Sequence, residues 1–290
     1  MLNLILIFAA AAEDIIRPAL FWSGIEQARI VYAGEKHDEA SHHEVQLQII
    51  QRFDNPVIGL EMLDRTQQPI LDEYINNGMP DSDFKKFWEQ NWGSYELYRP
   101  ILEYARARRL SVKALNMPGS VASQIYKGGL ASLTPEQRRL LPAEIHPIED
   151  ARYLEYVKKA AEEHTSDPVR IGYIIEAMQA WNETMGESLS RLVPMGRPLV
   201  VVAGAGHMIY RAGIPASVER RAAATQTVVL PYPFNGEQMP QEELVKNLKD
   251  PALGHVDFGD YFWLLPAKSA IIPKCQLSPP PWIIKLKTSA

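Results

Sequence analysis

The fold of this 290-residue chain is decided by an apolar stretch that ends at a glycine, Ala28-Arg29-Ile30-Val31-Tyr32-Ala33-Gly34. Its β-branched residues and its short length predict a buried strand. Five further runs of this kind follow, at residues 56–60, 110–115, 198–203, 225–230 and 261–265. Helical patterns separate most of them, and strands that alternate with helices form parallel sheets. We therefore expect an α/β fold with a mainly parallel sheet flanked by helices.

Helix-capping patterns support this alternation. Ser41-His42-His43-Glu44 has the form of a capping box, and Asp81 or Ser82 is a suitable N-cap for a later helix. Thr134-Pro135-Glu136-Gln137 combines an N-cap, a proline at the first helical position and a glutamine at the third. No strand pattern occurs between residues 119 and 193, which predicts a smaller helical subdomain inserted between two strands.

These patterns divide the chain into segments. Residues 13–118 and 194–270 are expected to form two halves of one α/β domain, with residues 119–193 as the helical subdomain. Residues 1–12 are apolar except for Asn3 and end in small residues, as in the remnant of an export signal. Residues 271–290 contain three consecutive prolines, which predict an extended tail. An export signal favours the periplasm or cell envelope, and the alternative is a buried first element in a cytoplasmic protein.

Composition excludes several classes of protein. The 30 basic and 35 acidic residues are interspersed and give a net charge of -5, so no basic stripe is available for nucleic acid. The single cysteine, Cys275, excludes an intrachain disulfide framework and a thiolate zinc cluster. The chain contains no Gly-x-Ser-x-Gly elbow, no P-loop and no His-Glu-x-x-His motif, which disfavours the common serine hydrolases, nucleotide hydrolases and zincins.

Polar residues follow four of the predicted strands at their carboxyl ends, where open parallel sheets bind ligands. Two strands run into Gly-x-x-His, with glycines expected to allow a tight turn and a close backbone approach. The other two end at a glutamate and an asparagine. The residues expected at this edge are Gly34, Glu35, His37, Glu61, Asn116, Gly204, Gly206 and His207.

Three of these residues are expected to converge and to carry chemistry. A carboxylate such as Glu61, placed between apolar neighbours, needs a partner, and His37 and His207 can supply one. Together they could hold a divalent metal ion with an open position. In a metal-free alternative, His37 acts as a general base that Glu35 or Glu61 orients.

Tyrosines and a further histidine offer a different kind of site. Tyr153, Tyr156 and Tyr210 could bind ferric iron as phenolates, as tyrosine does in some haem proteins. The competing interpretation is that these tyrosines belong to the core. His43 could extend a metal or porphyrin site together with His37, or it could serve packing alone.

The same segments resemble the ChaN family of haem-binding, iron-regulated proteins, in the group that also holds the Tiki, TraB and erythromycin esterase-like proteins. The resemblance runs from Ile30 to about Leu230. Its strongest segments are Gly34-Glu35-Lys36-His37-Asp38, Gly59-Leu60-Glu61-Met62, Ala114-Leu115-Asn116-Met117-Pro118, Ala177-Met178-Gln179 and Ala203-Gly204-Ala205-Gly206-His207.

The resemblance implies a domain with a parallel sheet, a smaller helical domain, and a homodimer that holds two stacked haems. Each iron would be bound by a tyrosine, with a histidine of the partner nearby. The Tiki-like branch implies instead a metal-dependent peptidase at His37, Glu61 and His207, and the erythromycin esterase-like branch implies a metal-free histidine base. The expected function is therefore haem binding in iron acquisition, with association to the envelope. The alternative is a metal-dependent hydrolase.

Overall fold

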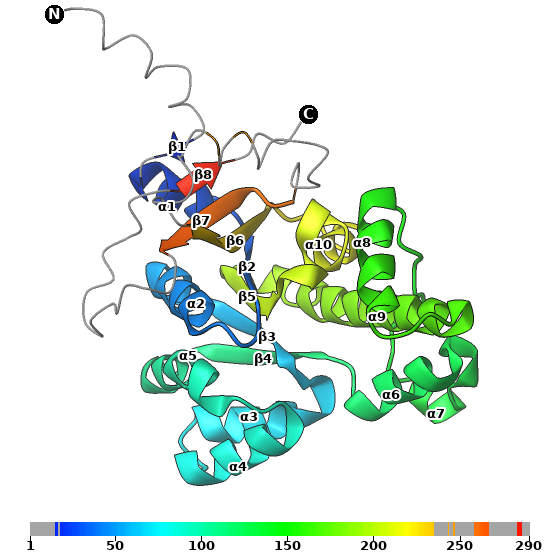
Figure 1. Ribbon diagram of the computed structural model, residues 1–290. Helices are drawn as coiled ribbons and strands as arrows, with labels where there is room; N and C mark the ends of the chain where they lie inside the picture. The colour runs from blue at the N-terminus through cyan, green and yellow to red at the C-terminus, as the bar shows by residue number, and fades with distance from the viewer. Residues whose placement is uncertain are drawn as a thin grey trace, which may run out of the picture.

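The computed structural model describes residues 15–16, 18–234, 258–266 and 283–285, with the single positions 243 and 246. Parallel strands form the centre of its sheet in the order β7-β6-β2-β5-β3-β4 (Figure 1). They are β2 (Ile30–Glu35), β3 (Val57–Asp64), β4 (Ser111–Asn116), β5 (Leu199–Gly204), β6 (Gln226–Phe234) and β7 (Tyr261–Pro266). Every strand predicted from the sequence is present, and the α/β fold is confirmed.

Two short strands that the sequence did not predict extend the sheet beyond β7. β8 (Ile283–Lys285) pairs with β7 in antiparallel orientation, and β1 (Ile15–Ile16) pairs with β8 in the same way. Both are too short to show a periodic pattern. Ile283 is fully buried, so part of the predicted Pro-rich tail belongs to the sheet. The rest of that tail and the predicted signal remnant at residues 1–12 lie outside the described residues.

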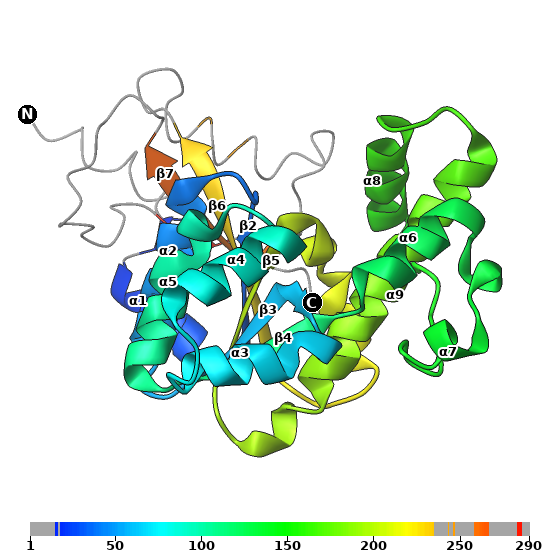
Figure 2. The same ribbon diagram turned by 90° about the horizontal axis from the view of Figure 1, so that it is seen from below.

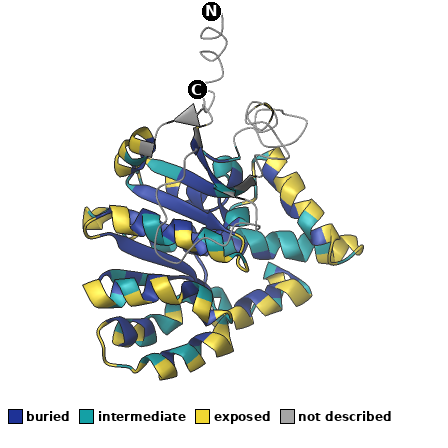
Figure 3. Ribbon diagram, turned by 60° about the vertical axis from the view of Figure 1, so that its left-hand side comes forward, coloured by how far each residue is buried: buried dark blue, intermediate teal, exposed yellow. Residues whose placement is uncertain are grey.

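Helices cover both faces of the sheet, so its central strands are buried on both sides (Figure 3). One layer contains α1 (Pro18–Glu26), α2 (Ala40–Arg52), α3 (Gln68–Ile75), α4 (Asp81–Asn91) and α5 (Tyr95–Arg108). The other contains α8 (Ala151–Glu162), α9 (Pro168–Ser190) and α10 (Ile214–Glu219). Alternation along β2 sends Val31 and Ala33 to the first layer and Ile30 and Tyr32 to the second.

The segment between β4 and β5 contains helices and turns but no strand, as the sequence predicts. Besides α8 and α9 it forms α6 (Gly119–Gly128) and the short α7 (Pro135–Arg138). Figure 2 shows α6, α7 and α8 grouped around one end of α9, beside the sheet. Val121, Ile125 and Ala177 belong to a small apolar cluster of this group. None of the helices of the described residues is long and apolar enough to cross a membrane.

The predicted caps have mixed outcomes. The capping box at Thr134 and Gln137 is confirmed. The predicted box at Ser41 is wrong, because α2 begins at Ala40 after Glu39 and has no side-chain cap. The prediction for α4 is also wrong, because its N-cap is Pro80. Oδ1 of Asp81 instead accepts hydrogen bonds from the hydroxyls of Tyr74 and Tyr95.

Two glycines in α9 provide a matched test of helix packing. A Cβ atom at Gly186 would lie 2.1 Å from Oγ of Ser217 on α10, whereas a Cβ atom at Gly172 meets nothing within 4 Å. Gly186→Ala should therefore lower the free energy of unfolding by about 1–3 kcal/mol through overpacking. Gly172→Ala should raise it by up to about 1 kcal/mol through helix propensity. Urea denaturation of both variants checks this, and equal effects would contradict the close approach of α9 and α10.

Candidate functional site

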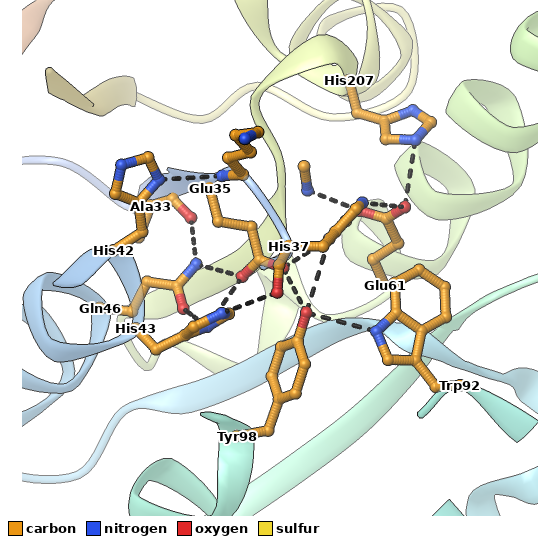
Figure 4. Close-up of polar contacts among 12 residues, drawn as sticks. Ala33, Glu35, His37, His42, His43, Gln46, Glu61, Trp92, Tyr98 and His207 are labelled. Carbon is orange, nitrogen blue, oxygen red and sulfur yellow. Dashed lines mark hydrogen bonds and ion pairs between the residues drawn. The ribbon is translucent and has the colours of Figure 1, made fainter. Parts of the chain in front are cut away.

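The carboxyl ends of β2, β3 and β5 bring the three chemically important side chains together (Figure 4). Oε1 of Glu61 lies 3.2 Å from Nε2 of His207 and 4.0 Å from Nε2 of His37. His37 follows β2, Glu61 is part of β3, and His207 ends the 3₁₀ turn that follows β5. Parallel strands end at one edge, which is why residues distant in sequence meet here.

Glu61 is a buried carboxylate whose oxygens are both engaged. Oε2 accepts the backbone N–H of Gly204 at 2.6 Å, and the Asn116 side chain donates to the Glu61 carbonyl oxygen at 2.9 Å. Burial raises the pKa of Glu61. His207, His37 and the Gly204 N–H outweigh that effect and lower this pKa to about 2. Glu61 is therefore ionised near neutral pH.

His37 is oriented by a second buried carboxylate. Its Nδ1 lies 2.6 Å from Oε1 of Glu35, which leaves Nε2 facing Glu61. Glu35 also accepts hydrogen bonds from Tyr98 at 2.5 Å and from Gln46 at 2.6 Å. Burial lowers the pKa of His37, but the hydrogen bond to Glu35 and the charges of nearby carboxylates raise it above its usual value. The Glu35–His37 pair thus holds a basic imidazole at the site.

His43 lies next to the Glu35–His37 pair and holds its backbone in place. Its ring is buried, with Nδ1 3.1 Å from Oε1 of Gln46 and Nε2 3.2 Å from the carbonyl oxygen of His37. The Tyr98 ring packs against it at 4.5 Å. With both nitrogens engaged inside the protein, His43 holds the turn between β2 and α2, and in this arrangement it does not reach a ligand.

His207 is fixed by a hydrogen-bonded chain that ends at a tyrosine. Its Nδ1 lies 2.8 Å from Oδ1 of Asn182, and the Asn182 amide donates to the Tyr153 hydroxyl at 2.8 Å. Tyr153 in turn donates to the carbonyl oxygen of Gly206 at 2.8 Å. Burial raises the pKa of Tyr153 well above its usual value. This tyrosine is fully buried with its hydroxyl engaged, so it positions the loop after β5.

A cavity of about 360 Å³ opens above the strand ends, and His37, Glu61 and His207 all line it. Two indoles, Trp92 and Trp181, also face this cavity. The ring of Trp92 meets that of His37 edge to face at 5.0 Å, and Trp181 meets His207 in the same way at 6.0 Å. The site therefore has room for a small molecule beside the polar triad.

The arrangement does not have the form of a metal centre. Within the part of the chain that the structure describes, no group of three or more His, Cys, Asp or Glu side chains is placed to hold a metal ion. In this geometry Nε2 of His207 and Nε2 of His37 lie 3.2 Å and 4.0 Å from the same oxygen of Glu61.

The glycines of the two Gly-x-x-His segments are not needed for the tight turn that the sequence had predicted. None of Gly34, Gly204 and Gly206 has a positive φ, so the turn itself does not require glycine. Close packing does. A Cβ atom at Gly204 would lie 3.0 Å from Nε2 of His37, and one at Gly34 would lie 2.6 Å from a methyl group of Leu230.

The other two predicted tyrosines lie in a partly exposed aromatic group, which we call the tyrosine patch. It consists of Tyr156, Tyr210, Phe258 and Arg152. The Phe258 ring lies 6.4 Å from that of Tyr156 and 5.2 Å from that of Tyr210, and the Arg152 guanidinium lies 4.9 Å from the Tyr210 ring. Tyr210 has a φ of 56°, an unusual backbone conformation that recurs at binding sites. Tyr156 packs beside Gly206, so the patch adjoins the loop that carries His207.

Several residues of the site were not predicted from the sequence. Tyr98, Asn182, Trp92 and Trp181 lie on or beside helices, where their sequence pattern is that of ordinary helical residues. Asn182 alone carries a usable signal, because a polar residue on the buried side of an apolar helix needs a partner.

The chain matches one family model and several solved structures of known proteins. The family model of haem-binding uptake proteins, Tiki superfamily, ChaN, matches residues 21–218. No curated protein sequence matches the chain significantly. A solved structure described as cofacial haem binding to ChaN of Campylobacter jejuni has a TM-score of 0.60 and 18% identity, and the match covers 76% of this chain and 91% of that chain.

A second solved structure, an erythromycin esterase mutant in its open conformation, has a TM-score of 0.47 and 15% identity, over 78% of this chain and 76% of that chain. At 18% identity, the match to the ChaN structure describes the fold alone. The family model spans most of the chain, including His37, Glu61, Tyr156 and His207. This chain belongs to the ChaN family of haem-binding uptake proteins in the Tiki superfamily.

Proposed function

We propose that this protein binds ferric haem on the tyrosine patch, with the Tyr156 phenolate as the axial ligand. One observation carries the proposal: the Tyr156 side chain is partly exposed, and its hydroxyl forms no hydrogen bond with another described residue. Tyr153, in contrast, is buried with its hydroxyl engaged. Burial, and then the charge of Glu163, raises the pKa of Tyr156, so the phenol is protonated until iron displaces the proton.

The rest of the patch fits the other needs of a porphyrin. An apolar surface is supplied by Tyr210 and Phe258, which lie edge to face. Arg152, which also pairs with Asp150 at 2.8 Å, lies over the Tyr210 ring, where its guanidinium could contact haem propionates. A haem site requires an axial ligand, an apolar slot and cations near the propionates. The patch offers a candidate for the ligand in Tyr156, apolar rings in Tyr210 and Phe258, and a cation in Arg152.

A second copy of the chain is part of the proposal. A surface patch on one chain covers one face of a porphyrin and leaves the other in water, which disfavours tight binding. Two patches placed face to face would cover a pair of haems between them. We therefore propose a homodimer that takes up haem for iron acquisition at the cell envelope.

Titration of the purified protein with hemin tests this function. The Soret band should saturate at one haem per chain, and sedimentation velocity should show a dimer in the presence of hemin. Binding that never saturates, and that an unrelated protein of similar size matches, would contradict the proposal.

The cavity favours one second candidate function, a hydrolase in which His37 is the general base. The observation is the Glu35–His37 pair, whose free Nε2 faces the cavity and lies 4.0 Å from Glu61. A water molecule between these groups could lose a proton to His37. Ester and peptide substrates can be assayed with the wild type and with His37→Gln. Hydrolysis by the wild type that the variant loses would support this function, and equal rates would oppose it.

A further inference from the structure

Three of the titratable groups that line the cavity, His37, Glu61 and His207, are paired within the protein. Glu61 contacts His207, and His37 contacts Glu35. No lysine or arginine side chain is among the described residues that line the cavity. Phosphates and carboxylates bind to cationic side chains, so this lining does not suit an anionic ligand. For a cationic ligand it offers only Asp64, one oxygen of which already accepts two hydrogen bonds from Thr66.

The remaining polar groups are planar amides held in fixed orientations. Gln67 donates to Oδ1 of Asn91 at 2.7 Å, Asn91 donates to the carbonyl oxygen of Phe87 at 2.7 Å, and Asn116 donates to that of Glu61 at 2.9 Å. Each amide nitrogen has two hydrogens, so a second donor remains on each. Together with the Asp64 carboxylate, these amides offer donors and acceptors side by side. Vicinal hydroxyl groups, which both donate and accept, match such a lining.

The apolar part of the lining is aromatic and rigid. The Trp92 indole N–H donates to the Tyr98 hydroxyl at 3.3 Å, and Trp181 packs edge to face against Tyr126 at 5.6 Å. Indoles held in this way present flat apolar faces to a ligand. The C–H face of a pyranose ring stacks on such a surface while its hydroxyls reach the amides.

From these features together we infer that the cavity binds an uncharged carbohydrate, or a molecule that carries one. A volume of about 360 Å³ lies at the lower end for ligand pockets and suits one or two sugar rings. The inference rests on the cavity and is independent of haem binding at the tyrosine patch. For the proposed hydrolase with His37 as general base, the inference gives a sugar-bearing molecule as the substrate class.

Isothermal titration calorimetry with matched sugars tests this inference. The neutral probes are glucose, N-acetylglucosamine and maltose, and the charged probes are glucose 6-phosphate, glucuronate and glucosamine. At least one neutral sugar should bind saturably at millimolar concentration, and its charged counterparts should bind at least about tenfold more weakly, which corresponds to ~1.4 kcal/mol. The inference is overturned if no neutral sugar binds saturably. It is also overturned if the charged sugars bind as tightly as the neutral ones.

Two variants locate the binding and a third controls for it. Trp181→Leu and Asn91→Ala should each weaken binding of the neutral sugar. The loss of indole stacking in Trp181→Leu should weaken it by about tenfold. Trp22→Leu removes an indole that packs on Phe21 and Trp263, outside the cavity, and should leave binding unchanged. Normal sugar binding by both cavity variants contradicts the inference. The hemin Soret titration, run on the same variants, reports separately on the proposed haem function.

Discussion

Replacement of Glu61 by leucine is expected to lower the free energy of unfolding by about 3–5 kcal/mol, the usual cost when one partner of a buried ion pair is removed. Glu61 is almost fully buried and accepts from Gly204, while its other oxygen contacts His207. Leucine leaves both of these groups without an acceptor inside the protein. Urea denaturation followed by circular dichroism measures the change.

Glu61→Gln is the matched control, since its amide oxygen can still accept from Gly204. It should destabilise the protein less than Glu61→Leu does. If the leucine variant unfolds at the same urea concentration as the wild type, Glu61 is not paired with His207 as described.

The same carboxylate gives stability a defined dependence on pH. The pKa of Glu61 falls from 4.5 to about 2 on folding, so the unfolded chain binds a proton more readily than the folded protein. The stabilisation, about 3 kcal/mol, is complete above pH 4.5 and is lost as the pH falls through 2. The stability difference between the wild type and Glu61→Gln should therefore shrink across this window.

Tyr156→Phe is expected to weaken hemin binding by at least about tenfold, because even residues that only support a metal ligand contribute 10–100-fold to affinity. The substitution removes one oxygen that forms no hydrogen bond with another described residue, so stability should not change. The absorption bands of tyrosinate-bound ferric haem should disappear at the same time. Soret titrations and thermal melts measure the two effects independently.

Tyr126→Phe is the matched control for this experiment. Tyr126 has nearly the same exposure, 37% against 38% for Tyr156, but it lies on α6 beside Trp181. Its removal should leave hemin affinity unchanged. If Tyr156→Phe binds hemin normally while Tyr210→Phe does not, the axial ligand is Tyr210 and the assignment to Tyr156 is wrong.

The sequence predicted the sheet and the convergence at its edge for a common reason. Runs such as Leu199–Gly204 are apolar on both faces, and this pattern occurs in buried parallel strands. Once the strands are known, topology brings His37, Glu61 and His207 to one edge without knowledge of side-chain packing. The structure adds the distances, which place Oε1 of Glu61 3.2 Å from Nε2 of His207 and 4.0 Å from Nε2 of His37.

Tertiary packing explains what the sequence did not predict. Tyr98 and Asn182 reach the site from α5 and α9, and only the placement of those helices against the sheet makes them partners of Glu35 and His207. The predicted cap at Ser41 failed because the N-cap of α2 is Glu39, two residues earlier. The sequence offered three candidate tyrosines for a haem ligand, and burial then separates the engaged Tyr153 from the partly exposed Tyr156.

The most direct test of the central claim is a crystal structure of the protein with hemin. We expect iron bound to the Tyr156 oxygen, a porphyrin packed on Tyr210 and Phe258, and a second copy of the chain covering its other face. Haem located in the cavity beside His37, or bound through a residue outside the tyrosine patch, would contradict the claim.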